Sequence, residues 1–241
     1  MNKTKIEWTD MTFNPETGCL HGCWYCYAKK IFTRFHKSFE PTFYPERLGE
    51  IGELKQPTER NNRGRKPWIV KAFPKNWLIF VCSVADLFAE WSKPEWTKQI
   101  LDTMAKHPQH IYQLLTKQPQ GIPQNSNFGD NVIVGVTITN DAEMDKLYTL
   151  VNCYKGRKFI SFEPLLGSVK IMQTDSYFDK IDWVIIGQLT GNKKVPIDKE
   201  VVRYIIRESR ARQIPVFIKS NVGWEEKIQE FPVAGILEEN L

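Results

Sequence analysis

Long apolar runs are absent from this sequence. None of its stretches reaches the roughly 18 consecutive apolar residues of a membrane-spanning helix, so we expect no membrane association. The N-terminal residues MNKTKIEWTD have no apolar run after their lysines, so we expect no secretory signal. These two absences together predict a cytoplasmic protein.

Cysteine is scarce, and the number of cysteines is odd. Five cysteines cannot all pair within one chain, and a cytoplasmic protein lies in a reducing compartment, so we expect no disulfide framework. Three of the five gather between positions 19 and 26. In a cytoplasmic protein such a cluster indicates metal or redox chemistry.

The overall composition is that of an ordinary globular protein. Hydrophobic residues make up 41% and charged residues 25% of the chain, which excludes a collagen, a coiled coil or a disordered tail. The 33 lysines and arginines outnumber the 28 acidic residues, and this net charge of +5 is compatible with an anionic partner. The chain has no internal repeat, and we expect one domain over residues 1–241.

Short runs rich in β-branched and apolar residues predict the strands of a parallel sheet. Most runs are continuous in hydrophobicity rather than alternating, which is typical of strands buried on both faces. A short run at Met11–Asn14 adds a further candidate strand. The main runs are Trp77–Cys82, Ile111–Leu115, Val132–Ile138, Lys158–Phe162, Trp183–Gly187 and Pro215–Lys219.

Helical patterns separate these runs. Apolar residues recur at helical spacing after Pro94, and Asn140 and Asp198 stand where they can cap two further helices. This alternation predicts right-handed βαβ units. We therefore expect an α/β protein, a partial (β/α) barrel of about six or seven mainly parallel strands with helices outside. An open doubly wound sheet is the alternative.

Polar residues directly follow the predicted strands. Ligands of α/β folds bind at the carboxyl ends of the strands, so these positions predict a polar pocket. The simpler explanation is that a chain reaches the surface where a strand ends. The residues are Ser83, Asp86, Thr116, Lys117, Thr139, Asn140, Glu163, Gln188, Thr190, Lys219, Ser220 and Asn221.

The strongest local signal is the segment 18–27, which reads GCLHGCWYCY. Its cysteines, Cys19, Cys23 and Cys26, have the spacing Cys-x3-Cys-x2-Cys. A structural zinc ion takes four ligands, and His21 or His36 is available as the fourth. A four-iron cluster usually takes four thiolates too, so three leave one iron open to a substrate or cofactor.

This loop, with an aromatic residue before the third cysteine, resembles the signature of the radical S-adenosylmethionine superfamily. The resemblance implies a 4Fe-4S cluster on the three cysteines, with S-adenosyl-L-methionine (SAM) bound at the open iron. It implies reductive cleavage of SAM to a 5′-deoxyadenosyl radical that abstracts hydrogen from a substrate. It also implies an electron donor such as flavodoxin or ferredoxin.

Further motifs, spread over nearly the whole chain, are similar to a family of radical SAM-like proteins of unknown function that is associated with phages and mobile elements. These motifs include IEWTD at 6–10, CYA at 26–28, LTK at 115–117, FEPLLG at 162–167 and FIK at 217–219.

Two motifs that the resemblance leads one to expect are missing. The superfamily's Gly-Gly-Glu, which holds the amine of SAM, is replaced by Cys82–Asp86, so we expect Ser83 or Asp86 to make that contact. The similar family is also expected to have the motif Gly-Gly-Glu-Ser-Gly after the strand at 183–187. This chain has Gly187-Gln188-Leu189-Thr190-Gly191 there, and the lost carboxylate indicates a changed substrate or weakened activity.

The resemblance also assigns residues to the cofactor. Tyr25 is expected near the adenine, and short polar side chains around Thr139 near the ribose hydroxyls. The expected cofactor-binding residues are Tyr25, Ser83, Asp86, Thr137, Thr139, Asn140, Glu163, Gly187 and Gln188. Glu163, Lys219 and Asp86 are the candidates for a catalytic role; Glu163 and Lys219 could instead form a structural ion pair.

Two other segments carry predictions. Tyr27, Ile31 and Phe35 share one face of a predicted helix, which indicates packing against the core. A basic insertion, about residues 38–76, has seven basic residues and one acid between Lys55 and Lys75. We expect its loop 63–67 to be exposed and flexible, and the segment 55–75 to bind a nucleic acid or nucleotide substrate near the pocket, with Trp68 and Trp77 available to stack on bases. The simpler interpretation is a solvated loop.

The sequence therefore predicts a radical SAM enzyme. A nucleobase or nucleic acid is the first hypothesis for its substrate. One alternative is a zinc-stabilised nucleic-acid-binding protein without catalysis, and another is a non-catalytic iron-sulfur protein.

Overall fold

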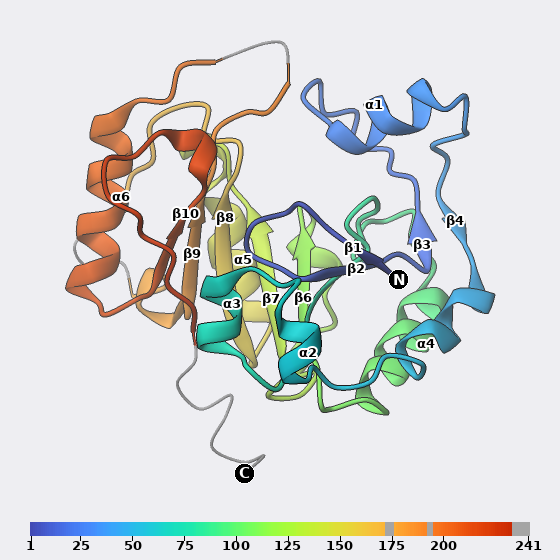
Figure 1. Ribbon diagram of the computed structural model, residues 1–241. Coiled ribbons are helices and arrows are strands. Elements are labelled where there is room, and N and C mark those ends of the chain that lie inside the picture. The colour runs from blue at the N-terminus through green and yellow to red at the C-terminus, as the bar shows by residue number, and fades with distance from the viewer. Residues whose placement is uncertain (172–175, 192–194, 233–241) are drawn as a thin grey trace.

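The centre of the molecule is a sheet of short strands, which are buried except for the edge strand at residues 2–3 (Figure 1). This computed structural model describes residues 1–171, 176–191 and 195–232. The strands are β1 (Asn2–Lys3), β2 (Met11–Phe13), β5 (Leu78–Val81), β6 (Ile111–Thr116), β7 (Val132–Thr137), β8 (Arg157–Phe162), β9 (Trp183–Ile186) and β10 (Val216–Ile218). Their order in the sheet is β1-β2-β5-β6-β7-β8-β9-β10. Only the pair β1 and β2 is antiparallel among these neighbours.

This strand order confirms the expected partial barrel. From β2 to β10 each strand pairs with the next one along the chain, apart from the small β3–β4 insertion. A doubly wound sheet would reverse its order at a switch point, so that alternative is wrong. Every predicted strand is present, including the short run at Met11, and β1 and β10 are the two edges of the sheet.

Helices follow the strands as the sequence predicts. Asp198 Oδ1 accepts a hydrogen bond from Glu200 N at 2.8 Å, so this capping residue is confirmed. Asn140 Oδ1 accepts one from Ala142 N at 2.9 Å, but it caps the short 3₁₀ helix Asp141–Glu143 rather than the α-helix that follows it. The helices after the strands are α4 (Pro94–Ala105), α5 (Asp145–Cys153) and α6 (Lys199–Ala211). In the described part of the chain no helix is both long and apolar enough to span a membrane.

The core has two parts because side chains alternate along each strand. Ile79 and Val81 point to an outer cluster that packs under the helices. Leu78 and Phe80 point to an inner cluster, which fills the barrel together with Trp8. Helix α3 (Pro67–Ala72) contributes Ile69 to this inner cluster. The interior of the barrel is therefore packed with side chains.

The segments between β2 and β5 lie at the two ends of the molecule. Helix α1 (Tyr27–Arg34) stands at the top of Figure 1, whereas α2 (Glu59–Asn62) and α3 lie lower down. The remaining elements are β3 (Glu16–Thr17), β4 (Thr42–Phe43) and the 3₁₀ helices Pro45–Ile51, Pro119–Gly121, Asp141–Glu143, Phe178–Lys180 and Ser220–Val222. Strands β3 and β4 form a separate antiparallel pair.

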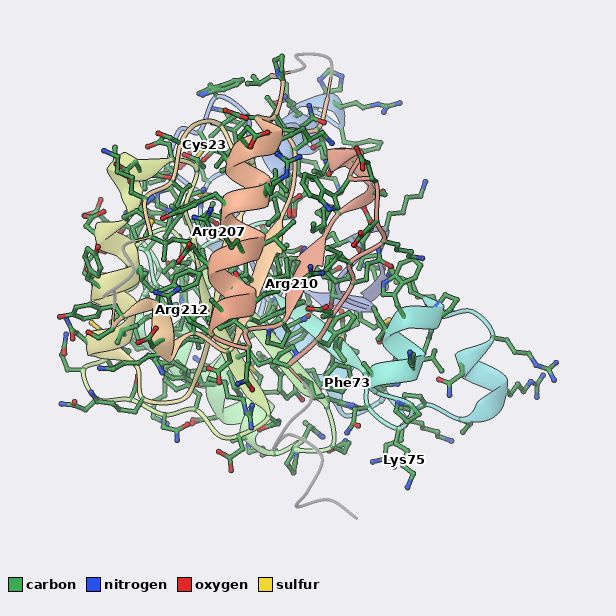
Figure 2. The ribbon with its side chains drawn as sticks, turned by 90° about the vertical axis from the view of Figure 1, so that its left-hand side faces the viewer. Cys23, Phe73, Lys75, Arg207, Arg210 and Arg212 are labelled. Atoms are coloured by element: carbon green, nitrogen blue, oxygen red, sulfur yellow. The ribbon has the colours of Figure 1, made fainter. Side chains whose placement is uncertain are left out.

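The basic insertion differs from its prediction in two respects. Arg65 is buried rather than exposed, because its guanidinium donates to Asp10 Oδ2 at 2.7 Å. Trp77 is buried in the outer cluster, which makes it unavailable for stacking on a base. In Figure 2 Lys75 lies at the opposite end of the molecule from Cys23, so this part of the insertion is remote from the cysteines.

Candidate functional site

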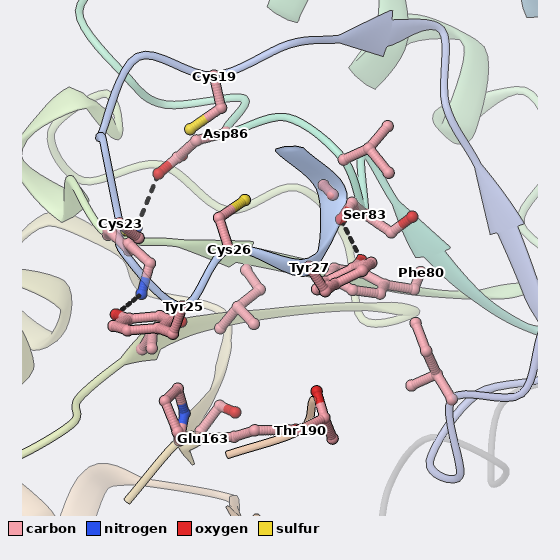
Figure 3. A pocket seen from close by; sticks show the side chains of 18 of the residues that line it. Cys19, Cys23, Tyr25, Cys26, Tyr27, Phe80, Ser83, Asp86, Glu163 and Thr190 are labelled. Atoms are coloured by element: carbon pink, nitrogen blue, oxygen red, sulfur yellow. Dashed lines mark hydrogen bonds between the residues drawn. The ribbon is translucent and has the colours of Figure 1, made fainter. Parts of the chain in front are cut away.

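A cavity of about 400 Å³ opens where the parallel strands end. This volume lies within the range of small-molecule sites. All three cysteines of the Cys-x3-Cys-x2-Cys loop line it, together with residues from the carboxyl ends of six strands. In Figure 3 Cys19 and Cys26 lie on one side of the pocket, and Glu163 and Thr190 lie across from them. The predicted pocket at the strand ends is therefore present.

Most of the predicted site residues meet in this cavity, and three do not. The lining contains Cys19, Cys23, Cys26, Tyr25, Ser83, Asp86, Thr137, Glu163, Gln188 and Lys219. Thr139, Asn140 and Gly187 are not among the lining residues. Sequence reasoning gave no role to Lys5 and Phe80, which also line it. Lys5 lies in the irregular segment between β1 and β2, where no sequence pattern marks it.

The loop 18–27, which we call the cysteine loop, is attached to the ends of β5 and β6. His21 Nε2 and Asp86 Oδ2 are 2.7 Å apart. Lys117 Nζ donates to the Tyr25 hydroxyl at 3.0 Å. The Tyr27 hydroxyl donates to the main-chain carbonyl of Ser83. These three contacts fix the cysteines over the mouth of the barrel.

Asp86 holds its position through hydrogen bonds to both carboxylate oxygens. Its Oδ1 accepts from the Thr116 hydroxyl at 2.6 Å and from Phe88 N at 3.2 Å. Its Oδ2 accepts from Lys117 N at 2.8 Å and pairs with His21. The carboxylate thus positions the cysteine loop. A contact between Asp86 and the amine of SAM stays a prediction, and this carboxylate would have to exchange one of its partners to make it.

The cysteine loop begins at a position that only glycine can occupy. Gly18 has a φ of +90°, and a Cβ atom there would lie 2.2 Å from the carbonyl oxygen of Glu40. The next residue, Cys19, donates its backbone N–H to the Phe39 carbonyl at 3.1 Å. The loop backbone is therefore in direct contact with the chain that leaves α1.

The three thiols differ in their surroundings. Burial raises the pKa of Cys19 to about 12, so this thiol is protonated in the absence of a cation. Cys26 caps α1, and its Sγ accepts a hydrogen bond from Lys29 N at 3.3 Å. Burial also shifts the pKa of Lys117, in this case downward, because it disfavours the charged ammonium form. Lys117 lies beside the Tyr25 ring. A protonated Lys117 would partly compensate the negative charge of three thiolates.

Three thiols that line one cavity are a donor set that an iron-sulfur cluster can use. Among the described residues, no three Cys, His, Asp or Glu side chains come together as one ion would require. A tetrahedral zinc ion draws its ligands to within about 2.0–2.3 Å of one point. A cluster instead binds each thiolate through a different iron, so its ligands are farther apart. All three thiols of the loop line the cavity in which such a cluster would lie.

Across the cavity, Glu163 forms an ion pair with Lys219 at the ends of β8 and β10. The pair depends on the glycine beside it, since a Cβ atom on Gly187 would lie 2.8 Å from Glu163 Cδ and 3.0 Å from Lys219 Cδ. Gly187 therefore provides space rather than a contact. Both charged side chains line the cavity, where each can leave its partner and bind a polar group of a ligand instead.

Two of the predicted ribose contacts have other partners. The Thr139 hydroxyl donates to Glu143 Oε2 at 2.7 Å, and Asn140 caps the following helix. Thr137, two residues earlier at the end of β7, does line the cavity. On the next strand but one, Gln188 Nε2 donates to the Val195 carbonyl at 2.9 Å. Of this group Thr137 is thus the residue best placed to meet a ligand.

Glu16, just before the cysteine loop, gives a prediction about stability. Its carboxyl is buried, and burial raises its pKa to about 7 despite a hydrogen bond from the Ser92 hydroxyl at 2.7 Å. A raised pKa means that the folded protein binds the proton more tightly than the unfolded chain does. The free energy of unfolding should therefore fall as the pH rises from about 4.5 to about 7, by roughly 2–3 kcal/mol.

Glu16→Gln removes this titration while keeping the shape of the protonated side chain. The variant should match the wild type near pH 4.5 and be more stable by about 2–3 kcal/mol at pH 8, as measured by urea unfolding. Glu90→Gln, at an exposed glutamate, is the control for loss of one charge. An equal loss of stability with pH in wild type and Glu16→Gln would contradict the assignment.

Comparisons with known proteins agree with this fold. Residues 3–234 match a family described as Protein of unknown function (DUF5131). A solved structure of a tyrosine-to-phenylalanine mutant of spore photoproduct lyase aligns with a TM-score of 0.53 and 9% identity, over 90% of this chain and 78% of that chain. A cysteine-to-serine mutant of the same enzyme gives 0.50 and 10%, with the same coverage. No curated protein is significantly similar in sequence.

At such low identity the likeness concerns the fold alone. The α/β architecture of spore photoproduct lyase, a mainly parallel sheet with helices, is also that of this chain.

Proposed function

The chain belongs to the DUF5131 family, whose description states no function, and we propose from the geometry of its cavity that it is a radical SAM enzyme. The observation that carries the proposal is that all three thiols of a Cys-x3-Cys-x2-Cys loop line one cavity at the carboxyl ends of parallel strands. Ligands of α/β barrels bind at that end. The loop resembles that of the radical SAM superfamily, which uses it on a partial (β/α) barrel to hold a 4Fe-4S cluster.

Cys19, Cys23 and Cys26 would hold a 4Fe-4S cluster in this cavity. When bound, the cluster would supply the electron that cleaves SAM to a 5′-deoxyadenosyl radical. The protein's own part is to position the loop and to limit access of water. Asp86 does the first through His21, and the inner barrel cluster, which packs below the cavity around Trp8 and Phe80, does the second.

The rest of the lining suits SAM and a substrate. Ser83 and Thr137 present short polar side chains that can meet an amine or a ribose hydroxyl. Glu163, which is paired with Lys219, lies across the cavity from Cys19 and Cys26 in Figure 3. We assign this pair to the substrate side, where it can bind a polar group and hold it toward the radical.

Anaerobic reconstitution of the full chain with iron and sulfide tests the proposal. We expect a brown protein with about four irons per chain, and release of 5′-deoxyadenosine after addition of dithionite and SAM. SAM should also change the electron paramagnetic resonance spectrum of the reduced cluster, because it binds an iron directly. Chromatography of the nucleoside and the spectrum are independent readouts.

Each alternative gives a different result in the same experiment. About one zinc per chain and no brown colour would replace the proposal by a zinc-stabilised protein. A cluster whose spectrum does not respond to SAM would show a non-catalytic iron-sulfur protein. A full cluster that responds to SAM but releases no 5′-deoxyadenosine would contradict the enzymatic activity.

A further inference from the structure

The helix that follows the cysteines carries an unusual apolar surface. Tyr27, Ile31 and Phe35 are 43%, 47% and 62% exposed, so the expectation that they pack against the core is wrong. Leu20 and Trp24, from the cysteine loop, are 51% and 55% exposed. Within the described part of the chain these five are the large hydrophobic side chains that are exposed. We call them the α1 face.

Helix α1 has little contact with the rest of the protein. Ala28 is its one buried residue, and the helix stands at the edge of the molecule in Figure 1. An isolated helix of eight residues is barely stable in water. Several exposed apolar side chains on such a helix and on the loop before it indicate a binding surface.

The charge around the α1 face has one sign. Residues 18–39 include no aspartate or glutamate, and they include Lys29, Lys30, Arg34 and Lys37, all exposed. None of these four cations takes part in an ion pair among the described residues. The partner of this surface should therefore be an anion with flat apolar groups.

The basic surface is continuous with the cavity. A shallow second hollow lies on the α1 side of the cysteine loop, and Cys23 and Cys26 border both hollows. Its other lining residues are Gly22, Trp24, Lys29, Lys30, Thr33 and Arg34. Inside the main cavity, Lys5 and Lys117 add positive charge and Phe80 adds an aromatic ring. A chain-like anion bound along α1 can therefore extend into the cavity.

We propose that the α1 face binds a single-stranded nucleic acid. Three of its five side chains are aromatic, and bases stack on such rings while lysines and arginines contact the phosphates. An acidic protein would match the charge but would not use separate exposed rings beside a row of cations. Binding itself needs no cluster. That the bound strand supplies the substrate rests on the proposed radical SAM function.

Fluorescence anisotropy with a labelled twelve-nucleotide oligothymidylate tests the proposal on the full chain. We expect binding that weakens steeply from 50 to 200 mM NaCl. The triple variant Lys29→Ala, Lys30→Ala, Arg34→Ala should bind about tenfold or more weakly at 100 mM NaCl. Its slope of log affinity against log salt should be smaller by about 2, because three phosphate contacts are lost. Phe35→Ala should weaken binding about three- to tenfold without changing the slope.

The basic insertion supplies a matched control. Arg63→Ala, Lys71→Ala, Lys75→Ala removes the same charge from exposed positions away from α1, and it should change affinity less than twofold. Equal weakening by both triple variants would overturn the proposal, as would equal binding of a duplex with no effect of Phe35→Ala. No binding by the wild type, or self-association through α1 seen by analytical ultracentrifugation, would overturn it too. Loss of 5′-deoxyadenosine release with oligonucleotide binding intact would count against the proposed function alone.

Discussion

Alanine at Cys19, Cys23 or Cys26 is expected to reduce 5′-deoxyadenosine release to the level of a protein-free control, whereas alanine at Cys153 leaves it intact. Each of the three thiols lines the cavity and would bind a different iron, so no neighbour can take over its task. Cys153 is buried at the end of α5, outside that lining, where its Sγ contacts Gln124 Nε2 at 3.0 Å. It is therefore a control for loss of a thiol as such.

The measurement combines iron and sulfide content with nucleoside release after anaerobic reconstitution. The three loop variants should have less iron per chain than the Cys153→Ala variant, and far-ultraviolet circular dichroism should be alike in all four. Full activity in any loop variant would mean that another ligand, such as His21, completes the site. Equal loss in Cys153→Ala would mean that reconstitution depends on folding rather than on the loop.

The strands were predictable because their burial is complete. A run such as Val132–Thr137 has both faces covered, so its hydrophobicity is continuous and visible in one sequence. The consecutive strand order follows from the regular alternation with helices, which favours neighbours in sequence as neighbours in space. The partial barrel therefore required no knowledge of distant contacts.

The site was predictable only as far as strand ends determine it. Ser83, Thr137 and Glu163 line the cavity because each follows its strand closely. Thr139 lies two residues beyond Thr137, far enough along for its hydroxyl to bind Glu143 instead. Whether a polar residue faces a ligand or caps a helix depends on the direction that the backbone takes over one or two residues. The sequence contains no signal for that direction.

Two predictions were wrong for a related reason: the packing of one helix face against the core, and the exposure of a cation in the basic insertion. Helical spacing of Tyr27, Ile31 and Phe35 shows that one face is apolar, but it does not show whether the protein itself covers that face. Similarly, a cluster of basic residues indicates a solvated surface until an acid from elsewhere is brought against one of them. Arg65 meets Asp10, which precedes it by 55 residues.

Replacing Arg65 with methionine is expected to lower the free energy of unfolding by about 3–5 kcal/mol, because it leaves the buried Asp10 carboxylate without its counter-charge. The side chains of Arg65 and Asp10 are 1% and 2% exposed. The guanidinium also donates to the carbonyls of Phe73 and Asn76, and it lies 4.7 Å from the centre of the Trp77 ring. Arg63→Met, at an exposed position two residues away, should cost less than about 0.5 kcal/mol in the same urea titration.

A double variant separates the ion pair from the other contacts of Arg65. Asp10→Asn alone leaves a buried cation, whereas Asp10→Asn with Arg65→Met leaves neither charge, so the double variant should cost less than the sum of the two single variants. Additive losses would show that the carbonyl and ring contacts of Arg65 dominate. Because this pair closes the end of the barrel opposite to the cysteines, none of these variants should change oligonucleotide binding at temperatures where they remain folded. A parallel loss of binding would place the nucleic acid on the insertion after all.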